Sequence, residues 1–333
     1  MNHSTLTSEF EQYSDWRDAV SARISAMRDW LSAQELSDAE SDLRMKQLLE
    51  RLHEDTLNVA FVAEFSRGKS ELINAIFFSD YRQRVLPTSA GRTTMCPTEL
   101  FYDATRRPSL RLLPIQTRNK NGTVADFKHE EGEWHEMPLN VDSADEMSAT
   151  LMRLADTIQV SNEEAELYGL IDSKDTETMR NLAQDGKIDI PRWRHALINF
   201  PHPLLMHGLV ILDTPGLNAI GTEPELTLNL LPSAHAVLFI LAADTGVTQS
   251  DIEIWRNYIA PVQGASRGRL VVLNKIDGMW DDLKTSEQIS AAIDRQVATS
   301  AQLLDLPESQ VYPVSAQKAL VAKIRNDPAL LAK

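Results

Sequence analysis

The segment from Val62 to Ser70, with the sequence VAEFSRGKS, carries residue types that bind phosphate groups. The mostly apolar run 57–61 before it predicts a buried strand, and residues 71–76 after it predict a helix. In a loop between strand and helix, backbone N–H groups and the helix N-terminus attract a phosphate. We therefore predict that Lys69 contacts the terminal phosphates of a nucleotide and that the Ser70 hydroxyl binds Mg²⁺.

One position of this loop departs from the usual phosphate-binding pattern, which is G-x-x-x-x-G-K-[ST]. Ala63 stands where that pattern has its first glycine. A single methyl group is tolerated there if the backbone φ angle is negative. The alternative is a chance Gly-Lys-Ser sequence between a strand and a helix.

Two further segments, in the expected order, predict contacts with Mg²⁺ and with the γ-phosphate. Asp213 follows the apolar run 208–212 and is predicted to support Mg²⁺ through water, while the Gly216 amide senses the γ-phosphate. Thr94 is predicted to bind Mg²⁺ from a switch loop, with Thr93 as the rival candidate. The alternatives are an ordinary Asp-Thr-Pro-Gly turn and two threonines that simply precede a strand.

The segment Asn274-Lys275-Ile276-Asp277 follows another apolar run and indicates which base is bound. An aspartate here can accept hydrogen bonds from both N1–H and the 2-amino group of guanine, a pair of donors that adenine lacks. A mismatch of this kind discriminates by a factor on the order of 10⁴. The sequence therefore predicts GTP, with an ATPase as the alternative. The predicted nucleotide-binding residues are Arg67, Gly68, Lys69, Ser70, Glu71, Asn274, Lys275, Asp277, Ser315 and Ala316.

In this order, the motifs resemble those of the GTPase domain of the dynamin superfamily, in its bacterial branch. The resemblance samples residues 58–318 and rests on four segments: Phe65–Ser70, Thr94–Pro97, Asp213–Asn218 and Asn274–Asp277. It implies an α/β P-loop GTPase fold, with a mostly parallel central sheet flanked by helices. It also implies Mg²⁺ as cofactor, a homodimer formed across the nucleotide face, and hydrolysis coupled to a helical bundle.

The resemblance assigns catalytic roles to some residues of this chain, while at other positions the expected catalytic residue is replaced. Ser66 matches a dynamin serine that helps hold a charge-compensating monovalent cation, K⁺ or Na⁺. Phe65 stands where dynamins have the glutamine that orients the attacking water, and Leu217 stands where Ras-like proteins have theirs. Arg67 either stabilises charge, in cis or across a dimer, or is a solvated loop arginine. The predicted catalytic residues are Ser66, Lys69, Thr94 and Gly216.

Two functions of different class remain open at this point. The first is a GTPase activated by nucleotide-dependent dimerisation, because Thr94, backbone groups or a second protomer would have to position the attacking water. The second is a GTP-binding switch or scaffold with negligible hydrolysis, which Ala63, Phe65 and Leu217 motivate. Under the second hypothesis, ordered switch loops recruit a partner.

Composition is that of a globular protein without a membrane span. The chain has 333 residues, 43% hydrophobic and 24% charged, and its longest apolar run, 236–243, is too short to cross a bilayer. A net charge of −15 disfavours nucleic acid. The single cysteine, Cys96, and the lack of a signal peptide indicate a cytoplasmic protein. A basic strip is predicted to be a solvated rim: Arg82, Arg84, Arg92, Arg106, Arg107, Arg111, Arg118 and Lys120.

Residues 1–56 are predicted to be a helical segment of the bundle type. An apolar stripe runs along the first helix, and Ser37 with Glu40 has the capping-box pattern that starts a second helix at about residue 38. The stripe residues are Trp16, Val20, Ile24, Met27 and Leu31. We expect a stalk or membrane-binding part to follow residue 333, so that the full protein could be peripheral at a membrane. A self-contained protein of this length is the alternative.

Residues 57–333 are predicted to form the GTPase domain, with an insertion at about 115–195. We expect paired strands within 98–113, a helical stretch at 142–181 that includes Ile158, and an antiparallel pair between 194–200 and 209–212. Alternating strands and helices then follow. The predicted strands are 236–242, 269–273 and 310–313, and the predicted helices are 250–258 and 286–304.

Overall fold

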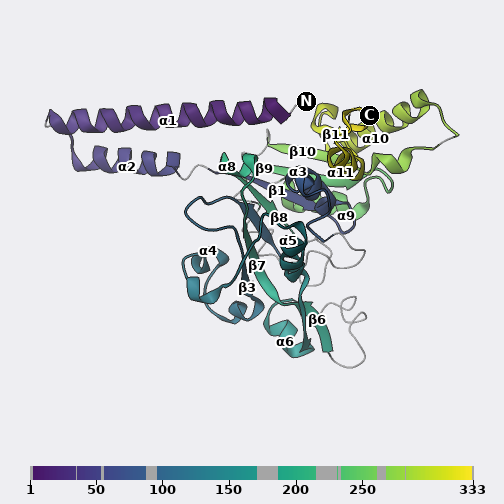
Figure 1. Cartoon of the computed structure of the whole chain (residues 1–333), viewed down its shortest axis with the longest axis horizontal. Helices are drawn as coiled ribbons and strands as arrows, with labels where there is room; N and C mark the ends of the chain where they lie inside the picture. Colours follow the sequence, from purple (N-terminus) through teal and green to yellow (C-terminus); the bar gives the residue numbers. More distant parts are fainter. Residues whose placement is uncertain are drawn as a thin grey trace.

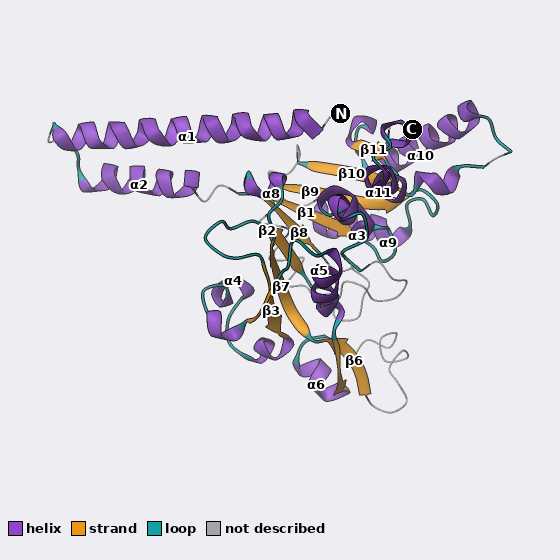
Figure 2. Cartoon of the chain, viewed as in Figure 1, coloured by secondary structure: helices purple, strands orange, loops and turns teal. Residues whose placement is uncertain are grey.

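The computed structural model is an α/β body from which two long helices extend (Figures 1 and 2). Helices cover both faces of its main sheet, and the termini of the chain are drawn close to one another in this view. The structure describes residues 3–34, 36–53, 56–87, 96–170, 187–214, 231, 234–260, 268–281 and 283–331.

The two amino-terminal helices, α1 (His3–Ala33) and α2 (Ala39–His53), form an antiparallel pair. Arg28 of α1 joins Asp42 of α2 through two hydrogen bonds of 2.6 and 3.1 Å. The helical prediction is confirmed, but the predicted cap is wrong, because Asp38 Oδ1 accepts from the Ser41 N–H at 2.7 Å. Among the described residues, no helix is both long and apolar enough to cross a membrane.

The main sheet has nine strands in the order β11-β10-β9-β1-β8-β2-β7-β3-β4. The first five in this order are mutually parallel, and most of their residues are apolar and buried, as expected of strands with helices on both faces. The strands are β1 (Leu57–Ala63), β2 (Thr98–Phe101), β3 (Ser109–Pro114), β4 (His135–Pro138), β7 (Trp193–Asn199), β8 (Leu209–Asp213), β9 (Ala236–Ala242), β10 (Arg269–Asn274) and β11 (Val311–Pro313).

The order of strands in the other half of the sheet differs from the prediction. β2 and β3 do not pair, because β7 lies between them, parallel to β2 and antiparallel to β3. β8 pairs with β2, so the predicted pairing of residues 194–200 with 209–212 is also wrong. Both predictions assumed that strands close in sequence are also neighbours in the sheet, and this assumption fails here. The long connection between β3 and β7 allows β7 to insert between the two earlier strands.

The segment between β3 and β7 contains short elements rather than one helical stretch. Ile158 lies in a strand that pairs antiparallel with residues 187–191, so its predicted helical position is wrong. Three of its five residues, 157–161, are β-branched, a composition typical of strands. Part of the stretch predicted as helical, residues 171–181, lies outside the described residues. The elements are α4 (Val124–Phe127), α5 (Ala144–Leu151), β5 (Thr157–Ser161), α6 (Asn162–Leu167) and β6 (Lys187–Pro191).

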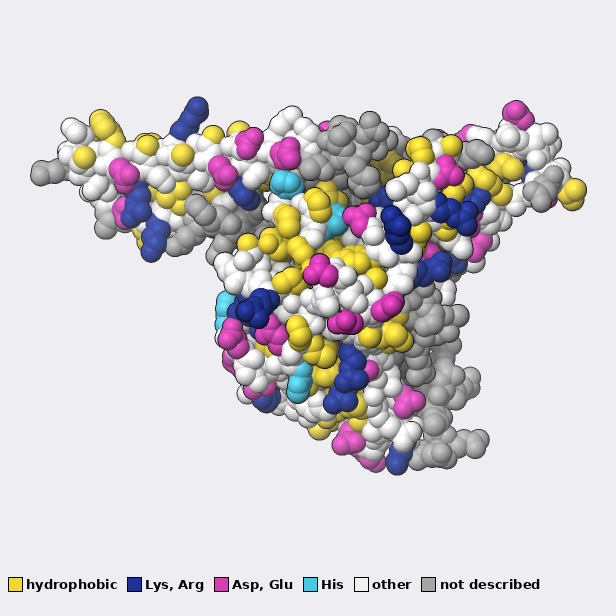
Figure 3. Space-filling view, viewed as in Figure 1, with side chains coloured by type: hydrophobic (Ala, Val, Ile, Leu, Met, Phe, Trp, Pro, Cys, Tyr) yellow, Lys and Arg dark blue, Asp and Glu magenta, His cyan; other side chains and the backbone are white. Residues whose placement is uncertain are grey.

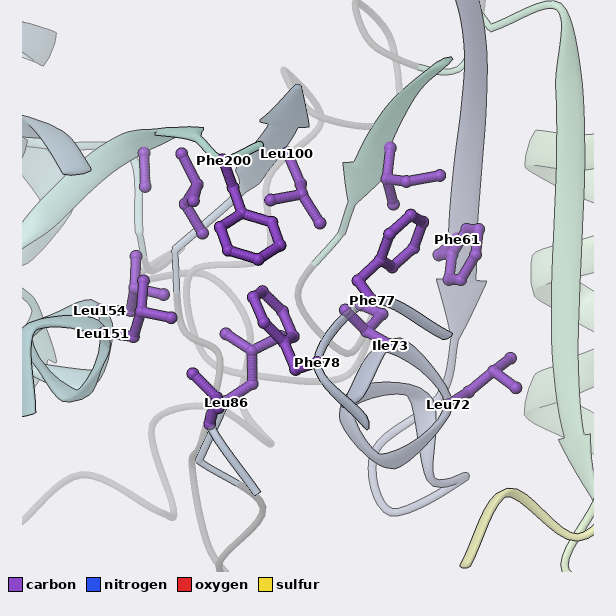
Figure 4. Close-up of a cluster of buried hydrophobic side chains, with 14 of the residues drawn as sticks. Phe61, Leu72, Ile73, Phe77, Phe78, Leu86, Leu100, Leu151, Leu154 and Phe200 are labelled. Atoms are coloured by element: carbon purple, nitrogen blue, oxygen red, sulfur yellow. The ribbon is translucent and has the colours of Figure 1, made fainter. Parts of the chain in front are cut away.

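Helices bury the two faces of the sheet. On one face α3 (Lys69–Phe77) and α11 (Ala316–Arg325) pack together, and Phe61, Phe77 and Phe78 lie in the apolar cluster there, each at most 3% exposed (Figure 4). Burying such a side chain contributes about 1.5–3 kcal/mol. The other face is covered by α9 (Gln249–Ile254), which continues as a π-helical turn to Ile259, and α10 (Ser286–Leu304). Two short helices, α8 (Pro203–Met206) and α12 (Pro328–Leu331), complete the described set.

A candidate nucleotide site at the carboxyl edge of the sheet

The predicted phosphate loop connects β1 to α3 at the edge where the parallel strands end. Ligands of open α/β sheets bind at this edge. Ala63 is the last residue of β1 and is not among the residues with positive φ, so its methyl group fits the strand. Ser66 and Gly68 have φ angles of 64° and 86°, and these left-handed conformations turn the loop back towards the helix.

Gly68 is the position where the loop meets the base-binding segment. A Cβ atom at residue 68 would lie 2.4 Å from Asn274 Nδ2, so only glycine fits. The Asn274 amide donates to the carbonyl oxygens of Arg67, at 3.0 Å, and Gly68, at 3.4 Å, and its Oδ1 accepts from the Ala316 N–H at 3.0 Å. Asn274 therefore ties the phosphate loop to the two segments predicted to surround the base. A direct contact of Asn274 with guanine stays a prediction.

Lys69 and Asp213 are brought together at the centre of the site. Lys69 Nζ lies 2.6 Å from Asp213 Oδ1, and both side chains are buried. Neither of these two atoms has a well-formed hydrogen bond among the described residues, so the contact is an ion pair with bonding capacity left over. Burial raises the pKa of Asp213 above its usual value, although Lys69 opposes this. Burial and the charge of Asp213 likewise raise the pKa of the nearby Cys96 thiol, which favours a packing role for that residue.

The base-binding segments are joined to each other. Ser315 Oγ donates to Asp277 Oδ1 at 2.6 Å, while also accepting from the Lys318 N–H that starts α11. Lys275 adopts a left-handed φ of 62°, and its Nζ lies 3.4 Å from Asp244 Oδ2. Asp277 is partly exposed and so can be reached by a ligand. Its carboxylate is oriented by Ser315 before any ligand binds.

Arg67 is buried, which corrects the interpretation of a solvated loop arginine. Only 6% of it is exposed, and its guanidinium binds Thr245 Oγ1 at 2.5 Å, Asp251 Oδ2 at 2.9 Å and Glu64. With its guanidinium held in this network, Arg67 positions the phosphate loop against α9. The sequence signal that was missed is the capping box Thr248-x-x-Asp251. This pattern predicts where α9 starts, but it does not show that Asp251 pairs with Arg67.

The other residues named from the sequence lie partly in the loop and α3 and partly outside the described residues. Glu71 is held by Arg84 through hydrogen bonds of 2.7 and 2.8 Å, so only its backbone is available to a nucleotide. Phe65 and Ser66 are exposed on the loop, Phe65 by 44%. Ser70 follows Lys69 in the first turn of α3. The predicted residues Thr94 and Gly216, the rival Thr93 and also Leu217 lie outside the described part of the chain.

The mostly parallel sheet, the loop between β1 and α3, and the acidic end of β8 define a P-loop GTPase fold. The sequence model of the dynamin family matches residues 59–276. This chain therefore belongs to the dynamin family and contains a GTPase domain of the dynamin superfamily.

Individual relatives agree with the family assignment. The chain is 26% identical over 171 residues to the bacterial dynamin-like protein of Nostoc punctiforme, covering 46% of this chain and 24% of that protein. It is 33% identical over 125 residues to the probable transmembrane GTPase FZO-like, chloroplastic, of Arabidopsis thaliana, covering 37% and 13%. The matches therefore span a quarter or less of these relatives.

A solved structure supports the fold. It is described as "An oligomerised bacterial dynamin pair provides a mechanism for the long range sensing and tethering of membranes". It aligns with a TM-score of 0.50 at 17% identity, covering 92% of this chain and 47% of that one.

Proposed function

We propose that this chain binds GTP with Mg²⁺ at the carboxyl edge of the sheet and hydrolyses it to GDP and phosphate. Lys69 contacts the β- and γ-phosphates, Ser70 and Thr94 hold the metal, Asp213 supports it through water, and the Gly216 amide contacts the γ-phosphate. When bound, Mg²⁺ neutralises charge on the phosphates. Ser66, by resemblance, helps hold a K⁺ or Na⁺ ion.

The observation that carries this proposal is the buried ion pair between Lys69 and Asp213. Removing one partner from a buried pair is costly, because a charge is left uncompensated. A nucleotide with its metal avoids that cost, because the phosphates become the counter-charge of Lys69 and the hydrated cation that of Asp213. The unused bonding capacity of Nζ and Oδ1 fits such an exchange of partners.

Guanine specificity is assigned to Asp277. Ser315 fixes the orientation of its carboxylate, and a carboxylate has lone pairs enough to accept two further hydrogen bonds. The N1–H and 2-amino groups of guanine supply those donors side by side. The Lys275 stem covers the base or the ribose, and the backbone of Ser315 and Ala316 closes over the base.

Hydrolysis is proposed to require a second copy of the chain facing the nucleotide. The loop residues that could orient water or stabilise charge do not do so here, because Phe65 has no polar group and Arg67 is held by Asp251 and Glu64. The exposed Phe65 ring offers an apolar contact on the face that a second protomer would cover. A GTP-binding switch with negligible turnover is the alternative that the same observation favours.

Phosphate release from GTP with Mg²⁺ and K⁺, measured over a range of protein concentrations, tests the proposal. The Lys69→Ala variant is the blank. We expect the rate per molecule to rise with protein concentration. GTP binding without release above the blank would favour the switch, and failure of GTP to bind would refute both. We further propose that hydrolysis is coupled to a membrane, because the names of this chain's relatives include a probable transmembrane GTPase and a bacterial dynamin pair that tethers membranes.

A further inference from the structure

A polar pocket of about 400 Å³ lies on the sheet face opposite α3, away from the nucleotide site. Its floor follows from the strand register, in which Arg111, Leu197, Glu99 and Leu212 are successive cross-strand neighbours and point to the same side. Asn58 lines it from the amino end of β1. That residue is six positions before the phosphate loop, so the two sites are separated by roughly 20 Å at about 3.3 Å per residue.

Arg111 is a buried cation in this pocket, and the fold supplies no hydrogen-bond partner for its Nη2 atom among the described residues. It is only 7% exposed, which corrects its predicted place in a solvated rim. The Nη2 atom is itself buried, and among the same described residues Arg111 also has no carboxylate within ion-pair distance. Its guanidinium carbon lies 5.0 Å from the centre of the Trp134 ring. Burial, and then the nearby Arg106, lower the pKa of Arg111, and the smaller opposing effects of Glu136 and Glu131 do not restore it, so the charge is held at a cost.

The other charged groups around the pocket compensate one another. Lys128 Nζ lies 2.8 Å from Glu99 Oε2, and the other oxygen of Glu99 accepts from His195 Nε2 at 3.0 Å. Arg106 pairs with Glu131 at 2.5 Å and lies 3.9 Å from Asp103. Among the described residues that line the pocket, Arg111 is therefore the charged residue without an ion pair within 4 Å, and its cross-strand neighbour Glu136 lies beyond that distance.

We propose that this pocket binds a small organic phosphate, with the guanidinium of Arg111 as its primary ligand. The planar guanidinium fork matches phosphate oxygens in a bidentate geometry, and a phosphate monoester carries a charge of about −1.5 to −2 at neutral pH. Lys128 and Arg106 line the same pocket and, although each is paired with a carboxylate, bring further donors close to it. Phe101 provides an apolar wall for the organic part, and the volume is at the small end of the range for ligand sites.

Calorimetric titration with phenyl phosphate, and separately with inorganic phosphate, tests the proposal. Both titrations use a Lys69→Ala background, so that the phosphate loop does not contribute. We expect saturable binding that Arg111→Met weakens at least tenfold. The matched control is Arg107→Met, which removes the same charge from an exposed neighbour. The absence of saturable binding by either probe, or equal binding in Arg111→Met, would overturn the proposal.

The melting temperature of the unliganded protein provides an independent readout. Because an unpaired buried charge is replaced by an apolar side chain of similar length, we expect Arg111→Met to melt at the same or a higher temperature. A clear fall would mean that the protein already compensates this charge, and would count against a ligand. If Arg111→Met does not fold, Arg111→Lys decides by titration, because it keeps the charge but loses the fork.

Discussion

Asp277 has one carboxylate oxygen bound to Ser315 Oγ, and this fixes how the group faces a base. In Asp277→Asn, one acceptor becomes a donor that matches the 2-carbonyl of xanthine instead of the 2-amino group of guanine. We expect GTP affinity to fall by on the order of 10- to 100-fold, the value of a charged hydrogen bond, while XTP affinity rises. Competition titration of both nucleotides measures this. Unchanged GTP preference would refute the assignment of Asp277.

Arg67 shows how a loop residue can be structural while its neighbours bind ligand. Replacing it with methionine leaves Asp251, which is fully buried, without its cation. We expect Arg67→Met to lower the free energy of unfolding by about 3–5 kcal/mol. Urea unfolding measures it, with Arg107→Met as the exposed control that should change stability by less than about 0.5 kcal/mol. Equal values for the two variants would show that the network around Arg67 contributes little.

Glu99 makes part of the stability depend on pH. Burial alone would raise its pKa, but the hydrogen bond and charge of His195 and the charge of Lys128 lower it from 4.5 to about 2. The folded state thus binds this proton more weakly than the unfolded state, so the stabilisation is present above pH 4.5 and is lost as the pH falls towards 2. Between pH 5 and pH 3, we expect the native chain to lose about 2 kcal/mol more than Glu99→Gln in urea unfolding. Parallel pH profiles would contradict this.

At the scale of elements, the junction of β1, α3 and β10 depends on the absence of a side chain at residue 68. In Gly68→Ala, the methyl group would strike the Asn274 amide and the backbone would remain at a positive φ. We expect a loss of about 1–3 kcal/mol of stability and weaker GTP binding. Gly132→Ala is the control, because a Cβ there meets no atom within 4 Å. Normal GTP binding by Gly68→Ala would show that Asn274 is not needed to hold the loop.

At the scale of the whole molecule, the helical pair extends from a compact body and contacts it mainly through α8. The predicted apolar stripe is only partly covered, since Trp16 and Met27 are 56% and 59% exposed. Acidic and basic side chains are interspersed over the described surface in Figure 3, while hydrophobic side chains lie along both helices. The described residues on the face drawn in Figure 3 therefore form no continuous basic patch, and the helices expose apolar side chains.

This arrangement predicts that the body folds and binds nucleotide without the helical pair. Deletion of residues 1–53 should leave GTP affinity within about twofold, because distant sites contribute independently. Fluorescence titration with labelled GTP measures the affinity, and a single cooperative thermal transition shows that the body is folded. A large loss of affinity would move the proposed boundary at residue 56 and make the helices part of the site.

Local sequence patterns were sufficient to predict the nucleotide-binding motifs and most helices and strands in the parallel half of the sheet. Strand 236–242 and helix 286–304 have the predicted bounds, because each carries its own apolar pattern and end signals. The positions of Lys69 and Asp213 at one edge follow from the rule that parallel strands end together. These inferences need only neighbouring residues and a general property of sheets.

Only the tertiary structure decided which distant segments meet. The insertion of β7 between β2 and β3, the burial of Arg67 against Asp251 and the tie from Asn274 to Gly68 join residues far apart in the chain. The sequence does not show whether an arginine faces solvent or a sheet, so Arg111 looked like one of several surface cations. Its burial depends on the strands and on Trp134 packed around it, which are long-range contacts that no local pattern specifies.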